Sequence, residues 1–265
     1  MPFLHLLTLI KSTMEELRVS SKRRARMKMA LQGPSGSGKT YSALQMAYGI
    51  TKDWSKIVVI DSENGSADLY AGLGSYNVLT LNDYTPELYI RAIDICESAG
   101  MQVIIIDSLS QSWETLLEEH ASMMGNSFTN WGKITPRHNA LVQRILTCKA
   151  HVIATMRTKQ DYVLNDKNGK MVPEKVGLKS IQRDGIDYEF TLVFDIDLTH
   201  KVTASKDRTG LFADKVPFVI TPECGEQIVS WCNSEIFNDL PIANEQINRA
   251  YGKYDYSPSN PSVRS

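Results

Sequence analysis

The feature that most constrains this chain is a glycine-rich octapeptide. It runs Gly33-Pro34-Ser35-Gly36-Ser37-Gly38-Lys39-Thr40. The spacing matches Gly-x-x-x-x-Gly-Lys-Ser/Thr, and the segment lies between a short apolar run, 27–31, and a helical pattern, 41–50. Glycines in such a loop let backbone N–H groups close around phosphate oxygens, and the helix that follows adds the positive end of its dipole. The sequence therefore predicts a strand, a phosphate-binding loop and a helix.

Two side chains of this loop have predicted roles on a bound nucleotide. Lys39 is expected to reach the β- and γ-phosphates, and the Thr40 hydroxyl is expected to bind Mg²⁺. The remaining loop residues are expected to contact the phosphates: Gly33, Pro34, Ser35, Gly36, Ser37 and Gly38. The predicted cofactors are accordingly ATP and Mg²⁺.

Two later apolar runs, 57–61 and 103–107, are continuous and β-branched, which is typical of parallel strands buried on both faces. Thr85 as N-cap, Pro86 at the first position and Gly100 as terminator predict a helix between them. A further helix is expected from Thr135 to Cys148, followed by a strand over 151–155. The alternation predicts a parallel α/β sheet with right-handed crossovers. A hairpin over 190–205 and a short helix over 226–232 are expected to follow.

Two carboxylates follow the apolar runs. Asp107 ends four apolar residues, where an aspartate would hold the hydration shell of Mg²⁺; the alternative is a residue that caps the next helix. Ser108 comes next, so a water-activating group must lie elsewhere. Glu63, just beyond the strand over 57–61, is the predicted base, and its alternative is an ordinary surface carboxylate.

The order of these motifs resembles a known family. Gly-Pro-x-x-Ser-Gly-Lys-Thr is followed by Ile-Asp-x-Glu ending at Glu63, by Tyr70-Ala71, by Ile95-Cys96-Glu97 and by Ile-Ile-Asp-Ser ending at Ser108. Over residues 27–212 the chain is similar to the ATPase core of RecA/RadA recombinases. It resembles more closely the core-only RecA-like ATPases of phages and prophages, including single-strand annealing recombinases. These proteins are often labelled only as AAA-domain or ATP-binding proteins. The expected fold is a RecA-like P-loop NTPase, with a mainly parallel sheet flanked by helices and an antiparallel edge hairpin.

The resemblance implies roles for further residues. Glu63 is the catalytic glutamate, Tyr70 stacks on adenine, and ATP lies between protomers of a homo-oligomer. The segment 205–210 resembles the one that RecA- and DnaB-type ATPases project toward a neighbour's γ-phosphate, so Lys206 and Arg208 are candidate catalytic cations. The alternative for Tyr70 is a tyrosine packed under the loop. The alternative for Lys206 and Arg208 is a solvated basic turn.

The chain departs from the RecA pattern in two places. RecA proteins end the strand that corresponds to 151–155 with a glutamine that senses γ-phosphate, whereas this chain offers Thr155 or Arg157. The choice between these two stays open at the level of sequence. The RecA C-terminal domain has no counterpart here, which leaves filament formation an open question.

Two polar connections fall where RecA-like proteins keep DNA-binding loops. The first, 125–137, interleaves Phe128 and Trp131 with Lys133 and Arg137, a mixture suited to stacking on bases and contacting phosphates. The second, 157–185, carries seven Lys/Arg against four acids. Loops of this length inside a domain are usually functional, so both are predicted to bind single-stranded DNA. The alternative is a pair of insertion loops with Trp131 packed inward.

Composition limits the remaining possibilities. A chain of 265 residues that is 42% hydrophobic and 22% charged suits one large globular domain with extensions. The predicted division is a basic extension (1–26), an ATPase core (27–233), a C-terminal extension (234–251) and a flexible tail (252–265). The four cysteines and the lack of a long apolar run favour a soluble protein in the cytoplasm of a bacterium or phage-infected cell, without membrane contact.

The sequence thus predicts an ATP- and Mg²⁺-dependent ATPase that binds single-stranded DNA in phage-type recombination, annealing or replication. A single-strand-binding protein is a further candidate partner. Two alternatives stay open: a P-loop phosphotransferase acting on a small molecule, and an ATP-dependent switch that binds proteins instead of DNA.

Overall fold

The computed structural model describes residues 26–167 and 170–234. Its strands are β1 (Lys28–Gly33), β2 (Ile57–Asp61), β3 (Asn77–Thr80), β4 (Val103–Asp107), β5 (His151–Lys167), β6 (Lys170–Ser180), β7 (Leu192–Ile196) and β8 (Val202–Asp207). Its helices are α2 (Lys39–Thr51), α3 (Pro86–Ser98), α4 (Leu109–Ser122), α5 (Ser127–Thr147) and α6 (Pro222–Asn233). Short 3₁₀ segments are η1 (Trp54–Lys56), η2 (Ser66–Leu73) and η3 (Ile186–Tyr188).

The strands form one sheet in the order β3-β2-β4-β5-β1-β7-β8, and β6 pairs with β5 off this path. Six neighbouring strands are parallel, whereas β8 is antiparallel to β7 and β6 is antiparallel to β5. This arrangement confirms the predicted fold, a mainly parallel P-loop NTPase sheet with an antiparallel edge pair.

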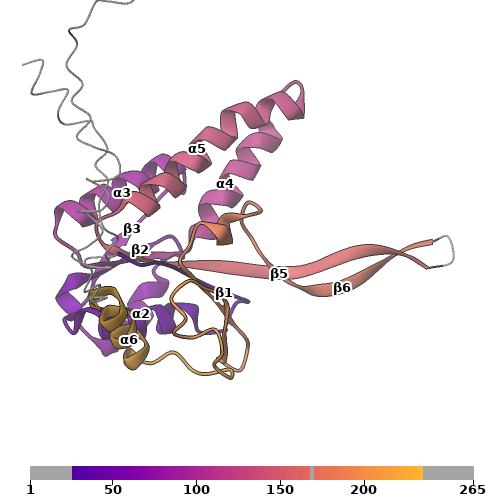
Figure 1. Cartoon of the computed structure of the whole chain (residues 1–265). Coiled ribbons are helices and arrows are strands. Elements are labelled where there is room, and N and C mark those ends of the chain that lie inside the picture. Colours follow the sequence, from indigo (N-terminus) through magenta and orange to yellow (C-terminus); the bar gives the residue numbers. More distant parts are fainter. Residues whose placement is uncertain (1–25, 168–169, 235–265) are drawn as a thin grey trace, which may run out of the picture. The chain divides into compact units, whose positions relative to one another are not determined.

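Helices cover both faces of the sheet, because its central strands are apolar on both sides (Figure 1). Met29 and Leu31 point to one face, where α2 and α6 pack. Ala30 lies on the other face, together with α3 and α5. In register, Asp61 lies beside Asp107 and Gly33 beside Arg157. The carboxyl ends of β1, β2, β4 and the central part of β5 therefore meet along one edge of the sheet.

The predicted start of α5 was wrong. The helix begins at Ser127, eight residues before Thr135, and Pro136 lies inside it. The Asn126 side chain caps it by accepting a hydrogen bond from Phe128 N at 2.8 Å. A 21-residue helix tolerates the one backbone bond that proline removes, because its other turns bury Ile134 and Ile145. The first predicted DNA-binding loop is therefore mostly helical.

The second predicted loop was also wrong. Strand β5 continues beyond the sheet and pairs with β6 from Lys167↔Lys170 to Thr158↔Ser180, so the segment forms a two-stranded arm (Figure 1). The intervening dipeptide is Asn168-Gly169, which strongly favours a two-residue hairpin turn. The basic and polar composition of this segment predicts a loop, whereas the Asn-Gly pair in its middle is a hairpin signal.

The predicted division of the chain stays a prediction. The basic extension, the C-terminal extension and the tail lie almost wholly outside the described residues. No helix within the described ranges is both long and apolar enough to cross a membrane.

Candidate active site

The phosphate-binding loop joins β1 to α2, as the sequence predicts. Gly38 precedes α2 with φ 87°, a left-handed conformation that favours glycine. Gly33 is pressed between the Ile196 carbonyl oxygen and Ser37 Oγ, so a side chain at this position would collide with both. The loop is therefore held between the end of β1 and the end of β7.

Lys39 closes over this loop. Its Nζ donates hydrogen bonds to Gly33 O at 2.9 Å and to Pro34 O at 2.8 Å. Burial lowers the pKa of Lys39 below its usual value, while the nearby carboxylates Asp107 and Glu63 act in the opposite direction. The Lys39 ammonium thus lies at the loop and binds neutral carbonyl oxygens, which a phosphate anion can replace as a stronger partner.

Asp107 lies at the end of β4 and is held by two hydroxyls. Thr40 Oγ1 donates to its Oδ2 at 2.6 Å, and Thr155 Oγ1 donates to its Oδ1 at 2.5 Å. Burial raises the pKa of Asp107, and these two hydrogen bonds oppose that rise. The Thr40 hydroxyl and the Asp107 carboxylate form a pair of hard oxygen donors, which is the ligand type that Mg²⁺ prefers.

Glu63 lies beside this pair, on the loop after β2. The buried Asp61 carboxylate shapes that loop by accepting hydrogen bonds from Glu63 N at 2.7 Å and from Ala67 N at 3.2 Å. The Glu63 carboxylate accepts from Ser108 Oγ at 2.6 Å, and it forms a two-point ion pair with Arg157 Nε (2.9 Å) and NH2 (2.5 Å). Four segments that are distant in sequence therefore meet here: the phosphate-binding loop, the loop after β2, the end of β4 and β5 at Arg157.

These groups line a cavity of about 540 Å³. Tyr70 lines it as well, and its ring lies 6.1 Å from that of Tyr41, centroid to centroid. Of the two γ-phosphate sensors that the sequence left open, Arg157 lines the cavity, whereas Thr155 is fully buried behind Asp107. A nucleotide at the loop would therefore have Arg157 within the same cavity.

Lys206 and Arg208 lie away from the cavity of their own chain. Lys206 pairs with Val193, at the amino-terminal half of β7, whereas the phosphate-binding loop contacts the carboxyl end of that strand at Ile196. Lys206 Nζ donates to Tyr188 O at 2.6 Å, and Arg208 NH2 donates to the same oxygen at 3.2 Å. Neither cation lines the cavity that holds Lys39 and Asp107 in its own chain.

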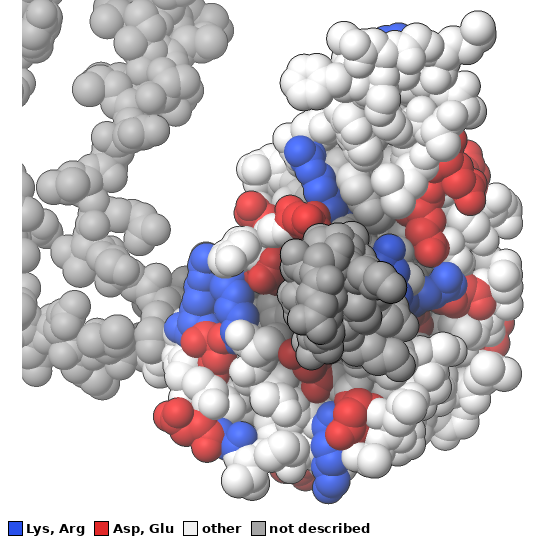
Figure 2. All heavy atoms as spheres, turned by 90° about the vertical axis from the view of Figure 1, so that its right-hand side faces the viewer, with Lys and Arg blue, Asp and Glu red and all other residues white. Residues whose placement is uncertain are grey.

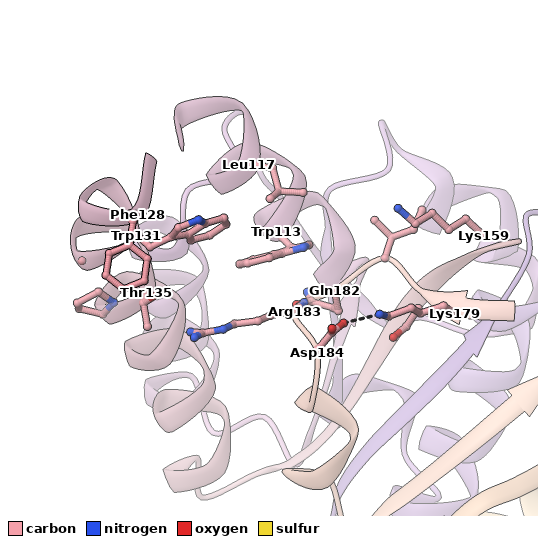
Figure 3. Close-up of a pocket in the computed structure, with 14 residues that line it drawn as sticks. Trp113, Leu117, Phe128, Trp131, Thr135, Lys159, Lys179, Gln182, Arg183 and Asp184 are labelled. Atoms are coloured by element: carbon pink, nitrogen blue, oxygen red, sulfur yellow. Dashed lines mark hydrogen bonds and ion pairs between the residues drawn. The ribbon is translucent and has the colours of Figure 1, made fainter. Parts of the chain in front are cut away.

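A second and larger cavity, of about 1090 Å³, lies between the α4–α5 pair and the base of the β5–β6 arm. Figure 3 shows Phe128, Trp131 and Trp113 on the helical side and Lys159 across from them, while the Arg183 side chain extends toward α5. We call this cavity the aromatic groove. Parts of both segments that the sequence predicted as DNA-binding loops, from α5 and from the base of the arm, line it together.

The candidate DNA residues differ in their availability within the aromatic groove. Phe128 is 86% exposed, whereas Trp131 is half-buried and stacks on His120 at 4.0 Å. Arg137 is bound to Glu87 and Glu119 and does not line the groove; neither does Lys133. Figure 2 shows positive and negative side chains interspersed around the arm, and a largely uncharged helical pair above it. The charged residues that Figure 2 colours therefore form no unbroken basic surface on this face.

Among the lining residues of the nucleotide cavity that were not predicted, His200 contacts the phosphate-binding loop directly. It lies in the turn between β7 and β8. His200 and its partner Ser37 are 163 residues apart in the sequence, and the turn that carries His200 has only an ordinary hairpin signature. The sequence offers no signal that would have found it.

A family model described as "AAA domain" matches residues 25–218. Among curated proteins, none matches this sequence. The matched region contains the phosphate-binding loop, both site carboxylates and the β7–β8 turn, and it covers well over half of the chain. The chain therefore belongs to the AAA-domain family, with an AAA/P-loop ATPase domain over the matched residues.

Proposed function

We propose that the protein is a Mg²⁺-dependent ATPase that binds single-stranded DNA and acts in phage-type recombination, annealing or replication. The observation that carries the ATPase proposal is the convergence of Lys39, Thr40, Asp107 and Glu63 at one cavity. Binding of a labelled ATP analogue and release of phosphate test it directly, with Mg²⁺ present and with Mg²⁺ removed by chelation. Binding and turnover that need no metal would contradict the proposal.

Each group has a distinct part in the proposed reaction. The loop N–H groups, the α2 N-terminus and Lys39 bind the triphosphate. Thr40 and Asp107 would hold Mg²⁺, which neutralises phosphate charge when bound. Asp107 keeps its orientation because Thr155 holds the second carboxylate oxygen.

Hydrolysis forms a bond from the water oxygen to the γ-phosphorus and breaks the bond from that phosphorus to the bridging oxygen. Glu63 accepts the proton that the water loses. The ion pair with Arg157 makes Glu63 a weaker proton acceptor, because both carboxylate oxygens accept hydrogen bonds from the guanidinium. A γ-phosphate is a competing anion for Arg157, so Arg157 is a better candidate than the buried Thr155 for sensing it.

The DNA proposal rests on the aromatic groove. Exposed Phe128 offers a face for base stacking, whereas Trp131 is stacked on His120 and Trp113 as in the inward-packed alternative. Lys159 and Arg183 offer positive charge to a phosphate backbone. Arg183 NH1 also donates to Asn139 Oδ1 at 3.2 Å, which fixes it at the groove wall. Strand β5 joins this groove to the ATP cavity, since Arg157 and Lys159 are two residues apart on it.

Phe128→Ala is expected to weaken binding of single-stranded DNA by about 1 to 3 kcal/mol, the range for one base–aromatic stack. The side chain is 86% exposed, so its removal costs the fold little. Fluorescence anisotropy with a labelled oligothymidylate measures the effect. Met124→Ala is the matched control, because Met124 is 95% exposed but does not line the groove.

The same titrations at several salt concentrations separate charge from stacking. Loss of Lys159 or Arg183 should each lower the salt dependence, by about 0.7 in the log–log slope per phosphate contact. Phe128→Ala should leave that slope unchanged. Binding that ignores salt, or equal affinities for Phe128→Ala and Met124→Ala, would contradict a DNA site in the aromatic groove.

We also propose that the protein forms a homo-oligomer that binds ATP between its subunits. This proposal is supported by the position of Lys206 and Arg208, which do not line their own chain's cavity and donate to Tyr188 O instead. If Arg208 acts on a neighbour's γ-phosphate, Arg208→Ala and Glu63→Gln proteins should each be nearly inactive. Mixing them should restore turnover, because some interfaces then combine an intact Arg208 with an intact Glu63.

Phosphate release by the mixture, measured against each variant alone at equal total protein, checks this prediction. Activity per wild-type chain should also rise with protein concentration as subunits associate. Turnover that is independent of concentration, together with no gain on mixing, would rule out a shared site.

A further inference from the structure

His200 makes a direct contact with the phosphate-binding loop. Its Nδ1 lies 2.9 Å from Ser37 O, and its ring lies against Gly38, where an added Cβ would stand 3.1 Å from Nδ1. A carbonyl oxygen can only accept a hydrogen bond, so Nδ1 carries the proton and donates. The imidazole therefore binds the loop through one defined nitrogen.

The turn that carries His200 is built to hold this position. Asp197 Oδ1 accepts from Thr199 N at 2.8 Å and from Lys201 N at 2.9 Å, while His200 N donates to Asp197 O at 3.0 Å. His200 has φ 62°, a left-handed conformation that is uncommon outside glycine but that Asn, Asp and His adopt more often than other residues. The closed turn thus holds His200 in a left-handed conformation while its ring reaches the loop.

The contact fixes a backbone donor of the nucleotide site. Ser37 C=O and Gly38 N–H belong to one peptide unit, and in a trans peptide these two groups point in opposite directions. A hydrogen bond that holds Ser37 O on the His200 side therefore turns the Gly38 N–H to the other side. Gly38 lines the cavity at the amino end of α2, where backbone N–H groups bind phosphate.

We propose that His200 is a positioning residue of the nucleotide site, which holds the Ser37–Gly38 peptide so that its N–H serves a phosphate oxygen. This inference rests on the proposed function, because it assumes a triphosphate in the cavity. It assigns a role to a side chain that acts through the loop, although His200 and Ser37 are 163 residues apart in the sequence.

Three substitutions at position 200 separate the side-chain donor from the backbone conformation. His200→Gly keeps a left-handed residue but loses the donor. His200→Asn supplies an amide donor near the place of Nδ1 and tolerates the left-handed region. His200→Ala loses the donor and strains the turn as well. Leu198→Ala, in the same turn and 66% exposed, is the matched control.

Equilibrium binding of a fluorescent ATP analogue with Mg²⁺, together with KM and kcat for ATP, tests the proposal. His200→Gly should weaken binding and raise KM by about 3- to 10-fold, as expected when one net hydrogen bond no longer holds the competent loop conformation. The value of kcat should change less, because the phosphate contact exists before and during the reaction. His200→Asn should recover most of the affinity, and Leu198→Ala should match the wild type.

Wild-type affinity in a folded His200→Gly protein, or equal losses in the Gly and Asn variants, would overturn the role of His200. Equal binding of ATP by wild type and by Lys39→Ala would instead overturn the proposed nucleotide site, and this inference with it. The two failures are therefore distinguishable in one set of titrations.

Discussion

Lys39→Ala should abolish tight ATP binding and turnover while the protein stays folded. Among the described residues the Lys39 ammonium donates to two loop carbonyls, Gly33 O and Pro34 O. Its removal therefore deletes a proposed phosphate ligand and leaves the apolar core unchanged. A lost charge-assisted contact to a triphosphate lowers affinity by at least one to two orders of magnitude, on the order of 1.5 to 3 kcal/mol per bond.

Binding of a fluorescent ATP analogue, phosphate release and a thermal melt measure this effect. Lys56→Ala is the matched control, because Lys56 lies in η1 just before β2, at the opposite edge of the sheet from the cavity. The control should keep wild-type binding. Normal turnover in folded Lys39→Ala would contradict the assignment of the loop as a phosphate site.

Glu63→Gln should retain Mg²⁺-ATP binding and lose turnover by about 10²- to 10⁴-fold, the usual contribution of a general base. Glutamine keeps the size of the side chain and one acceptor oxygen for Ser108 Oγ, but it cannot accept the water proton. The charged half of the ion pair with Arg157 is lost as well, which frees the guanidinium for an incoming phosphate.

Glu114→Gln is the matched control for this substitution. Glu114 Oε2 lies 3.5 Å from Arg157 NH1, so the control removes a carboxylate near the same guanidinium without touching the predicted base. Single-turnover kinetics should show a large loss for Glu63→Gln and a small change for Glu114→Gln. Equal kcat values for wild type and Glu63→Gln would remove Glu63 from the mechanism.

The sequence predicts the parts of this fold that local rules determine. The loop from Gly33 to Thr40 and the strands ending at Asp61 and Asp107 follow from a motif and from continuous apolar runs. The meeting of Glu63 with Asp107 follows too, because parallel strands bring their carboxyl ends to one edge of the sheet. These inferences need only strand direction and neighbouring positions in the sheet.

Tertiary packing decided the parts that sequence reasoning missed. Pro136 suggested a helix start, yet burial of the surrounding turns keeps it inside α5. Basic and polar residues over 157–185 suggested a loop, whereas pairing between β5 and β6 makes an arm. The partners of Arg157 and His200 are Glu63 and Ser37, which no spacing rule connects to them.

ATP turnover as a function of single-stranded DNA concentration tests the central claim most directly. We expect wild-type protein to hydrolyse Mg²⁺-ATP slowly alone and faster with oligothymidylate, because β5 carries both Arg157 at the ATP cavity and Lys159 at the aromatic groove. Phe128→Ala should keep the basal rate and need more DNA for stimulation. Turnover that DNA leaves unchanged would favour a protein-binding switch, and turnover only with a small-molecule acceptor would favour a phosphotransferase. Wild-type turnover no higher than that of Lys39→Ala, with Mg²⁺ and saturating DNA present, would contradict the account.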